Sequence, residues 1–173
     1  SGLLVVAKHD RAHRHLGEQF RAHSVDRVYT LLCWGTPSPS ELTIESSIGR
    51  SSRDRRKMTS LPRSGKHAVT HYRVVENYGP VAMVECALET GRTHQIRLQC
   101  SARGLPILGD RQYGAECSFG PAEDDDRQRW IALHARRLAF THPMTREKVD
   151  ITAPLTSYWD PLGLALPEQH PGS

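Results

Sequence analysis

Residues 68–88 read AVTHYRVVENYGPVAMVECAL, two apolar runs separated by a short polar break. The runs, residues 68–75 and 81–88, contain several Val residues together with Thr and Tyr, which favour extended strands. Tyr78, Gly79 and Pro80 lie between them and indicate a turn, because Gly and Pro interrupt regular structure. This stretch therefore predicts an antiparallel hairpin.

The rest of the chain extends the hairpin into a sheet with few helices. A buried strand is expected at residues 3–7, Asp10 can cap a helix over residues 11–22, and Thr93 can cap a second helix that ends at Gly104. Further strands are predicted at residues 25–34, 42–48, 130–140 and 147–151. Because strands outnumber helices and follow one another directly, the predicted fold class is α+β, with a mostly antiparallel (mixed) sheet and few packed helices.

Length and composition indicate one domain. The chain has 173 residues, of which 38% are hydrophobic, enough to build a core. We expect the domain to cover residues 1–155 and a proline-rich tail to cover residues 156–173. The longest apolar run, Leu3 to Ala7, is far shorter than the roughly 20 residues of a membrane span. No secretory signal is visible, so a cytoplasmic protein without a membrane partner is expected.

The cysteines and histidines do not predict a metal site. No CxxC pair occurs among the four cysteines, Cys33, Cys86, Cys100 and Cys117. Reduced thiols are therefore expected rather than zinc ligands or disulfide bonds. His9 and His13 are four residues apart, but no carboxylate stands with them in a metalloprotease pattern. We expect neither a metal nor a cofactor.

A basic segment near the middle of the chain predicts a polyanionic partner. The chain carries a net charge of +4, but residues 50–66 contain seven Lys and Arg against Asp54 alone, a local charge of +6. Such a segment can neutralise phosphates and release their counterions; a solvated basic loop is the alternative. The predicted RNA-binding residues are Arg50, Arg53, Arg55, Arg56, Lys57, Lys66 and His94.

The run ETGRTHQIR, residues 89–97, follows the hairpin directly. Gly91 permits a tight turn there, and the positive end of a helix that starts at Thr93 suits an anion. His94 and Arg97 are three residues apart and so share a helix face. Arg97 could hold a catalytic carboxylate in a bidentate contact, or equally serve as a structural residue that bonds a loop carbonyl.

The same run resembles the T-G-R-T-H-Q-I-R signature of the RluA-type pseudouridine synthases. Four further segments match that family in order and spacing, so that the resemblance covers most of the chain. They are Arg27-Val28-Tyr29 (K-x-Y), residues 65–72 (G-K-x-A-x-T-x-Y), residues 104–114 (G-x-P-I-x-G-D-x-x-Y-G), and Leu133-His134-Ala135 with His142-Pro143 (L-H-A and H-P).

The resemblance implies an enzyme that isomerises uridine in RNA to pseudouridine without a cofactor. In this family the glycosidic bond breaks, the uracil turns, and it rejoins the ribose through C5. The family's nucleophile is an aspartate in the motif H-R-L-D-x-x-T-S-G, whose end Ser1 and Gly2 resemble. The aspartate would fall four residues before Ser1. We therefore expect the full-length protein to be active and this fragment alone to be inactive.

The resemblance also implies roles for individual residues. Tyr29 matches the tyrosine that removes the C5 proton, although the same residue in an isolated strand would be expected to pack in the core. Arg97 matches the partner of the absent aspartate and would lack that partner here. His94 and Gln95 are expected to organise the turn. Asp110 is expected to cap a loop rather than replace the nucleophile.

Gln99 stands where the family more often has His, which argues against a catalytic role for it. Tyr29 and Arg97 are expected to line one cleft. The RNA could be ribosomal or transfer RNA, and no obligatory protein partner is evident. A catalytically inactive RNA-binding module of the same fold is the main alternative, since a metal-dependent nuclease would need carboxylate-rich ligand spacing.

Overall fold

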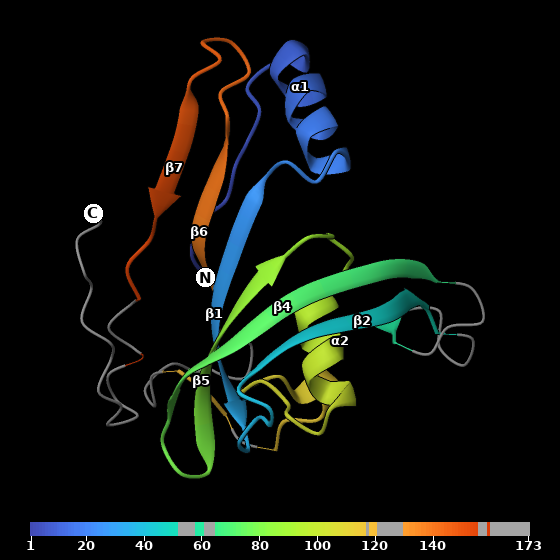
Figure 1. Ribbon diagram of the computed structural model, residues 1–173, viewed down its shortest axis with the longest axis vertical. Coiled ribbons are helices and arrows are strands. Elements are labelled where there is room, and N and C mark those ends of the chain that lie inside the picture. Colours follow the sequence, from blue (N-terminus) through green and yellow to red (C-terminus); the bar gives the residue numbers. More distant parts are fainter. Residues whose placement is uncertain (52–57, 61–64, 117, 121–129, 156–158, 160–173) are drawn as a thin grey trace.

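The computed structural model describes residues 1–51, 58–60, 65–116, 118–120, 130–155 and 159. Its centre is a seven-stranded sheet in the order β3-β2-β4-β5-β1-β6-β7, with every neighbouring pair antiparallel (Figure 1). The predicted α+β class is confirmed. The elements are α1 (Asp10–Arg21), β1 (Asp26–Trp34), β2 (Glu41–Arg50), β3 (Met58–Thr59), β4 (Lys66–Asn77), β5 (Val81–Leu88), α2 (Gln95–Ala102), η1 (Arg111–Tyr113), β6 (Leu133–Thr141) and β7 (Lys148–Thr152).

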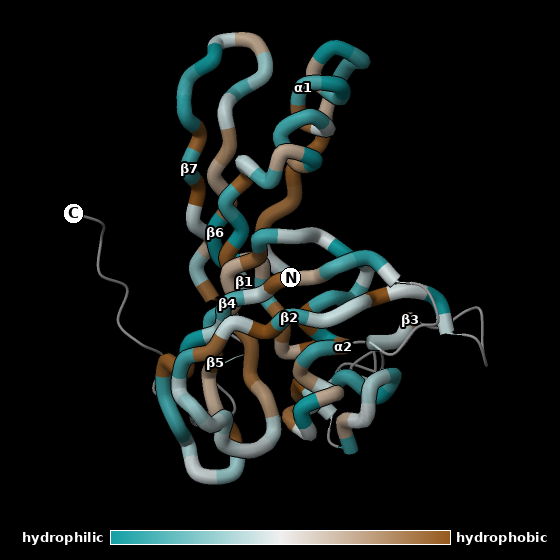
Figure 2. The backbone as a smooth tube through the Cα atoms, turned by 45° about the vertical axis from the view of Figure 1, so that its right-hand side comes forward, coloured by the Kyte–Doolittle hydropathy of each residue, from teal (hydrophilic) through white to brown (hydrophobic). Residues whose placement is uncertain are grey.

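The predicted hairpin forms the middle of the sheet. It consists of β4 and β5, with Tyr72 opposite Cys86, and β5 pairs on its other edge with β1. Hydrophobic residues concentrate in these central strands, whereas α1 is largely hydrophilic (Figure 2). Helix α2 packs beside β2, and its Ile96 belongs to the same buried cluster as Leu31 and Met83. The hairpin thus holds the motif that follows it against the core.

Residues 3–7 do not form the buried strand that the sequence predicted. Leu4 is 85% exposed and Val6 is 73% exposed, and only Gly2 makes an isolated bridge, with Ala135 of β6. The reason is that the edges of β6 are taken: β1 pairs along one and β7 pairs from Arg137 onward along the other. Ala135 lies beyond the end of β7, which leaves room for this single bridge.

The start of α1 also differs from the prediction. The N-cap is His9 rather than Asp10, since the His9 ring Nδ1 accepts a hydrogen bond from the Ala12 amide at 3.2 Å. Asp10 is the first residue of the helix itself, where its charge favours the positive end of the helix dipole. Ala12 and Leu16 are buried as the apolar spacing predicted.

The C-terminal stretch, predicted to be a tail from residue 156, contributes at least one core residue. Trp159 is fully buried, and its ring packs edge-on against Phe119 at 5.6 Å between centroids. In the described parts of the chain no helix is long and apolar enough to cross a membrane. The same residues contain no group of three His, Cys, Asp or Glu side chains that could hold a metal ion.

Three of the cysteines are free thiols placed in or beside the core, and Cys117 lies outside the described residues. Burial raises the pKa of Cys33 to about 11 and that of Cys86 to about 12, and it raises the pKa of Cys100 as well. These thiols stay protonated at pH 8, and the thiolate is the reactive form. Iodoacetamide at pH 8 should therefore leave all three unlabelled in the folded protein and label them after unfolding, as read by peptide mass spectrometry. Labelling of Cys86 in the folded protein would contradict this burial.

Candidate active site

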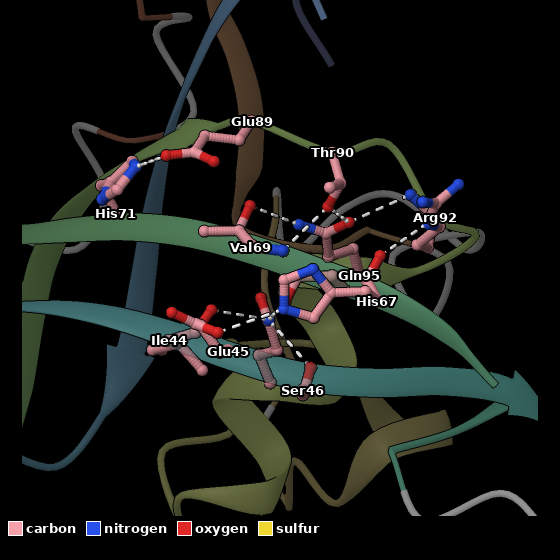
Figure 3. A network of polar contacts seen from close by, with 12 residues as sticks. Ile44, Glu45, Ser46, His67, Val69, His71, Glu89, Thr90, Arg92 and Gln95 are labelled. Atoms are coloured by element: carbon pink, nitrogen blue, oxygen red, sulfur yellow. Dashed lines mark hydrogen bonds and ion pairs between the residues drawn. The ribbon is translucent and has the colours of Figure 1, made fainter. Parts of the chain in front are cut away.

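The motif at residues 89–97 is tied to the sheet by one buried amide. Gln95 is 3% exposed. Its Nε2 donates to the Val69 carbonyl at 3.0 Å and to Thr70 Oγ1 at 2.8 Å, while its Oε1 accepts from Thr90 Oγ1 at 2.8 Å and from the Arg92 amide at 3.0 Å (Figure 3). All hydrogen-bonding groups of this amide are thus used. The predicted organising role of Gln95 agrees with these contacts.

A second buried amide extends the network to β2. Gln99 is 2% exposed, and its Oε1 accepts a hydrogen bond from Thr70 Oγ1 at 2.6 Å. Its Nε2 donates to Ser46 Oγ at 3.0 Å and to the Ile44 carbonyl at 3.3 Å. These contacts occupy the Gln99 side chain from within the protein.

Loss of the first amide should weaken the fold more than loss of a neighbouring surface residue. Replacing Gln95 with Ala leaves buried donors and acceptors without partners, so we expect the free energy of unfolding to fall by about 2–3 kcal/mol. Thr93 is exposed and does not cap α2, so Thr93→Ala serves as the control and should change stability by less than about 0.5 kcal/mol. Urea unfolding followed by circular dichroism measures both, and equal midpoints would contradict the network.

Helix α2 begins at Gln95, and His94 rather than Thr93 is its N-cap. His94 adopts a left-handed backbone conformation, φ 55°, without a side-chain cap bond. Its ring Nδ1 lies 2.8 Å from Tyr113 Oη in η1. Burial lowers the pKa of His94, and the nearby Arg97 lowers it further. A neutral imidazole at neutral pH is favoured by both effects.

Arg97 has a carboxylate partner other than the upstream aspartate that the family resemblance implies. Its Nε and Nη2 donate to the two oxygens of Asp110, each at 2.7 Å, and Nη2 also donates to Gln112 Oε1 at 3.1 Å. The guanidinium lies 4.8 Å from the centre of the Tyr113 ring. Asp110 is 1% exposed and makes no cap bond to η1, so its side chain serves Arg97 rather than the loop. His94 and Arg97 both contact Tyr113, although His94 lies at the N-cap, outside the helix.

Tyr29 lies half-buried in β1, between Cys86 of β5 and Ala135 of β6. The pairing with β6 shifts register between Val28 and Tyr29. The first residues of the chain meet β6 at the same place, because the Ser1 amino group donates to the Leu133 carbonyl at 3.1 Å and Gly2 bridges to Ala135. Ser1 and Tyr29 are therefore separated by one strand.

Tyr29 and Arg97 contact different parts of the protein. Leu31 and Cys33 line one small apolar space with Ile96 of α2, and Tyr29 shares their face of β1 because alternate residues of a strand point the same way. Within the described residues no hydrogen bond or ring contact joins Tyr29 to Arg97. The shared cleft expected for these two residues stays a prediction.

A cleft of about 910 Å³ lies where the ends of β2 and β4 meet the motif turn. It brings together three of the predicted RNA-binding residues, Arg50, Lys66 and His94, and adds Arg92, which the prediction missed. Arg92 Nε donates to the His67 carbonyl at 2.9 Å, beside the Gln95 network (Figure 3). Arg92 lies within the motif at residues 89–97, and this position could have identified it from the sequence. The other predicted residues, Arg53, Arg55, Arg56 and Lys57, lie outside the described residues.

Comparison with known proteins agrees with this geometry. The profile described as RNA pseudouridylate synthase matches residues 1–102. The chain belongs to this family. It is 42% identical to RNA pseudouridine synthase 2, chloroplastic, of Arabidopsis thaliana, over 89% of this chain and 41% of that protein. It is also 42% identical to the ribosomal large subunit pseudouridine synthase D of Zymomonas mobilis, over 88% of this chain and 49% of that protein.

A solved member of the family has the same fold. Human RNA Pseudouridylate Synthase Domain Containing 1 superimposes with a TM-score of 0.69 at 32% identity, covering 86% of this chain and 62% of the human one. The chain spans less than half the length of the Arabidopsis and Zymomonas pseudouridine synthases. The described sheet thus has the fold of a pseudouridylate synthase domain, and the family acts on RNA.

Proposed function

We propose that the full-length protein isomerises specific uridines of ribosomal or transfer RNA to pseudouridine. Residues 1–155 form its catalytic domain and residues 156–173 a C-terminal tail, of which Trp159 packs into the core. The observation that carries the proposal is the position of Tyr29, one strand away from the anchored Ser1. The family's nucleophilic aspartate would precede Ser1 by four residues, so it would enter the fold on the side of Tyr29.

The chemistry assigned to these groups balances without a cofactor. The target uridine leaves its stack and enters the site. The aspartate bonds to the ribose C1′ as the bond from C1′ to the uracil N1 breaks. C5 of the turned uracil then bonds to C1′, which releases the aspartate, and N1 takes up a proton. The Tyr29 oxygen then takes the C5 proton, which requires a base held within hydrogen-bond reach. Arg97 would pair with the aspartate in place of, or together with, Asp110.

Tritium release tests this proposal directly. Pseudouridine formation frees the C5 hydrogen of uridine, so we expect the full-length protein to release tritium from total RNA labelled at C5 and the present chain to release none. No release by the full-length protein would refute the proposal. Release by the present chain alone would refute the assignment of the nucleophile to the upstream segment.

A catalytically inactive RNA-binding module is the second candidate. The observation that favours it is the bidentate pairing of Arg97 with Asp110, which already neutralises the arginine that should serve the nucleophile. The same assay separates the two functions, because a binding module retains RNA but releases no tritium at any protein concentration.

The basic segment should contribute affinity rather than chemistry. Its arginines contact phosphates in this proposal, and each neutralised phosphate adds about 0.7–0.9 to the slope of log affinity against log salt. We expect Arg53→Ala, Arg55→Ala and Arg56→Ala together to flatten that slope. Filter binding over a salt series measures it. An unchanged slope would remove these three residues from the RNA interface.

A further inference from the structure

Arg27 of β1 is a cation without an acidic partner in the described part of the chain. Its Nη2 donates to the Glu89 carbonyl over 3.4 Å, and its guanidinium carbon lies 5.5 Å from the centre of the Phe20 ring. Its Nε is buried and makes no hydrogen bond to the residues that the structure describes. By contrast, the sheet arginines Arg73 and Arg137 each pair with a carboxylate. The buried Nε is out of reach of an external group, so the Nη hydrogens that the Glu89 carbonyl does not accept are the donors available to an anion.

Gly91 places this guanidinium at the edge of the basic cleft. A Cβ atom on Gly91 would lie 2.4 Å from Arg27 Nη1, so the guanidinium packs directly over this glycine. Gly91 also lines the 910 Å³ cleft, together with Arg50, Lys66 and Arg92. Arg27 thus borders the surface on which the other cations of this region gather.

Arg27 lies beside Tyr29 as well. The two residues are two positions apart in β1, and alternate residues of a strand share a face. Burial lowers the pKa of Arg27, and interaction with the Tyr29 phenol opposes that shift. The two side chains are therefore close enough to interact electrostatically, and a group bound by Arg27 would be held next to Tyr29.

We infer that the Arg27 guanidinium binds a phosphate of the RNA strand that carries the target uridine, at the junction between the basic cleft and Tyr29. This inference rests on the proposed function. A phosphate would accept charge-assisted hydrogen bonds from the guanidinium fork, which a planar arginine is built to donate. It would also place an anion beside a cation that burial has partly stripped of water. Such a contact positions the strand without reading its bases.

A methylphosphonate scan tests the contact by binding. The full-length protein is titrated with a stem-loop RNA that has a single loop uridine and, in turn, one uncharged methylphosphonate near it. We expect one position to weaken binding by the unaltered protein about tenfold, because a hydrogen bond to a charged group is lost. Arg27→Gln should bind the all-phosphate RNA about tenfold more weakly than the unaltered protein does. A methylphosphonate at that one position should then weaken binding by Arg27→Gln no further.

Arg137→Gln is the control for this scan, and Arg27→Lys is the replacement variant. Arg137 lies in register with Val28 and is already paired with Asp150, so Arg137→Gln should reproduce the scan of the unaltered protein. The inference would be overturned if every methylphosphonate weakened binding by Arg27→Gln as much as it weakens binding by the unaltered protein. It would also be overturned if Arg27→Gln bound the all-phosphate RNA as tightly as the unaltered protein does. If Arg27→Gln does not fold, Arg27→Lys is scanned instead, because the family pattern has Lys at this position. Its scan must then show a smaller effect at the same position, and a scan identical to that of the unaltered protein would overturn the contact.

Failure of this inference and failure of the proposed function can be told apart. The scan measures affinity alone, whereas tritium release measures isomerisation. A protein that binds RNA with the expected coupling but releases no tritium keeps the Arg27 contact and loses the enzymatic proposal. A protein that releases tritium but shows no coupling keeps the enzyme and loses the contact.

Discussion

Full-length protein carrying Tyr29→Phe is expected to release tritium from C5-labelled uridine about 10² to 10⁴ times more slowly than the unaltered protein, the range for loss of a positioned proton acceptor. Affinity for RNA should change little, because the ring that packs in β1 is retained. The phenol oxygen is the only atom lost, so the effect isolates its chemistry. Single-turnover release, compared with filter binding on the same RNA, measures the two effects separately.

Tyr78→Phe is the matched control for this substitution. Tyr78 lies in the turn between β4 and β5, where its hydroxyl donates to Glu76 at 3.2 Å. Burial and the neighbouring Glu76 raise its pKa to about 12, which makes it a poor base near neutral pH. Its replacement should leave the rate of release unchanged. If both Phe variants are equally active, Tyr29 is not the proton acceptor.

Asp110→Ala is expected to lower the free energy of unfolding by about 3–5 kcal/mol, because it leaves the guanidinium of Arg97 unpaired in a poorly hydrated place. Asp110 is 1% exposed and the Arg97 side chain 15% exposed, and two hydrogen bonds of 2.7 Å join them. Replacing both residues with Leu should cost less than removing Asp110 alone, since no uncompensated charge then stays behind. Urea unfolding of the three variants measures these differences.

A second bidentate pair, which joins two strands of the sheet, provides the comparison. Arg137 of β6 and Asp150 of β7 are joined in the same way, but their side chains are 40% and 38% exposed. Water screens such a pair, so Asp150→Ala should leave the unfolding midpoint almost unchanged. Equal shifts for Asp110→Ala and Asp150→Ala would show that burial of the Arg97 pair contributes nothing to stability.

Local sequence patterns predicted most strands of this fold. The hairpin at residues 68–88 is found as β4 and β5, and the strand expected at residues 25–34 is β1. Residues 3–7 were predicted wrongly because their apolar run is typical of a buried strand, whereas burial also requires a free sheet edge. Both edges of β6 are occupied beyond Ala135. The pattern of a segment contains no information about which edges its neighbours leave open.

The candidate site was predictable in its residues and less so in its contacts. The motif at residues 89–97 identified Gln95 and Arg97, but the partner of Arg97 lies 13 residues away across a loop. The helix start was misplaced because the residue at the N-cap is His94, whose left-handed backbone precedes Gln95, and no side-chain cap bond marks the start. Long-range pairing of side chains depends on the folded backbone, and no local spacing encodes it.

The position of β1 bears on how the chain is synthesised. The second edge of β1 is covered only by β6, which follows about a hundred residues later in the chain. High contact order of this kind slows folding. A nascent chain would expose an unpaired apolar edge at β1 until residues 133–141 emerge, and such edges favour aggregation. Folding of this domain is therefore expected to finish only after most of it has been translated.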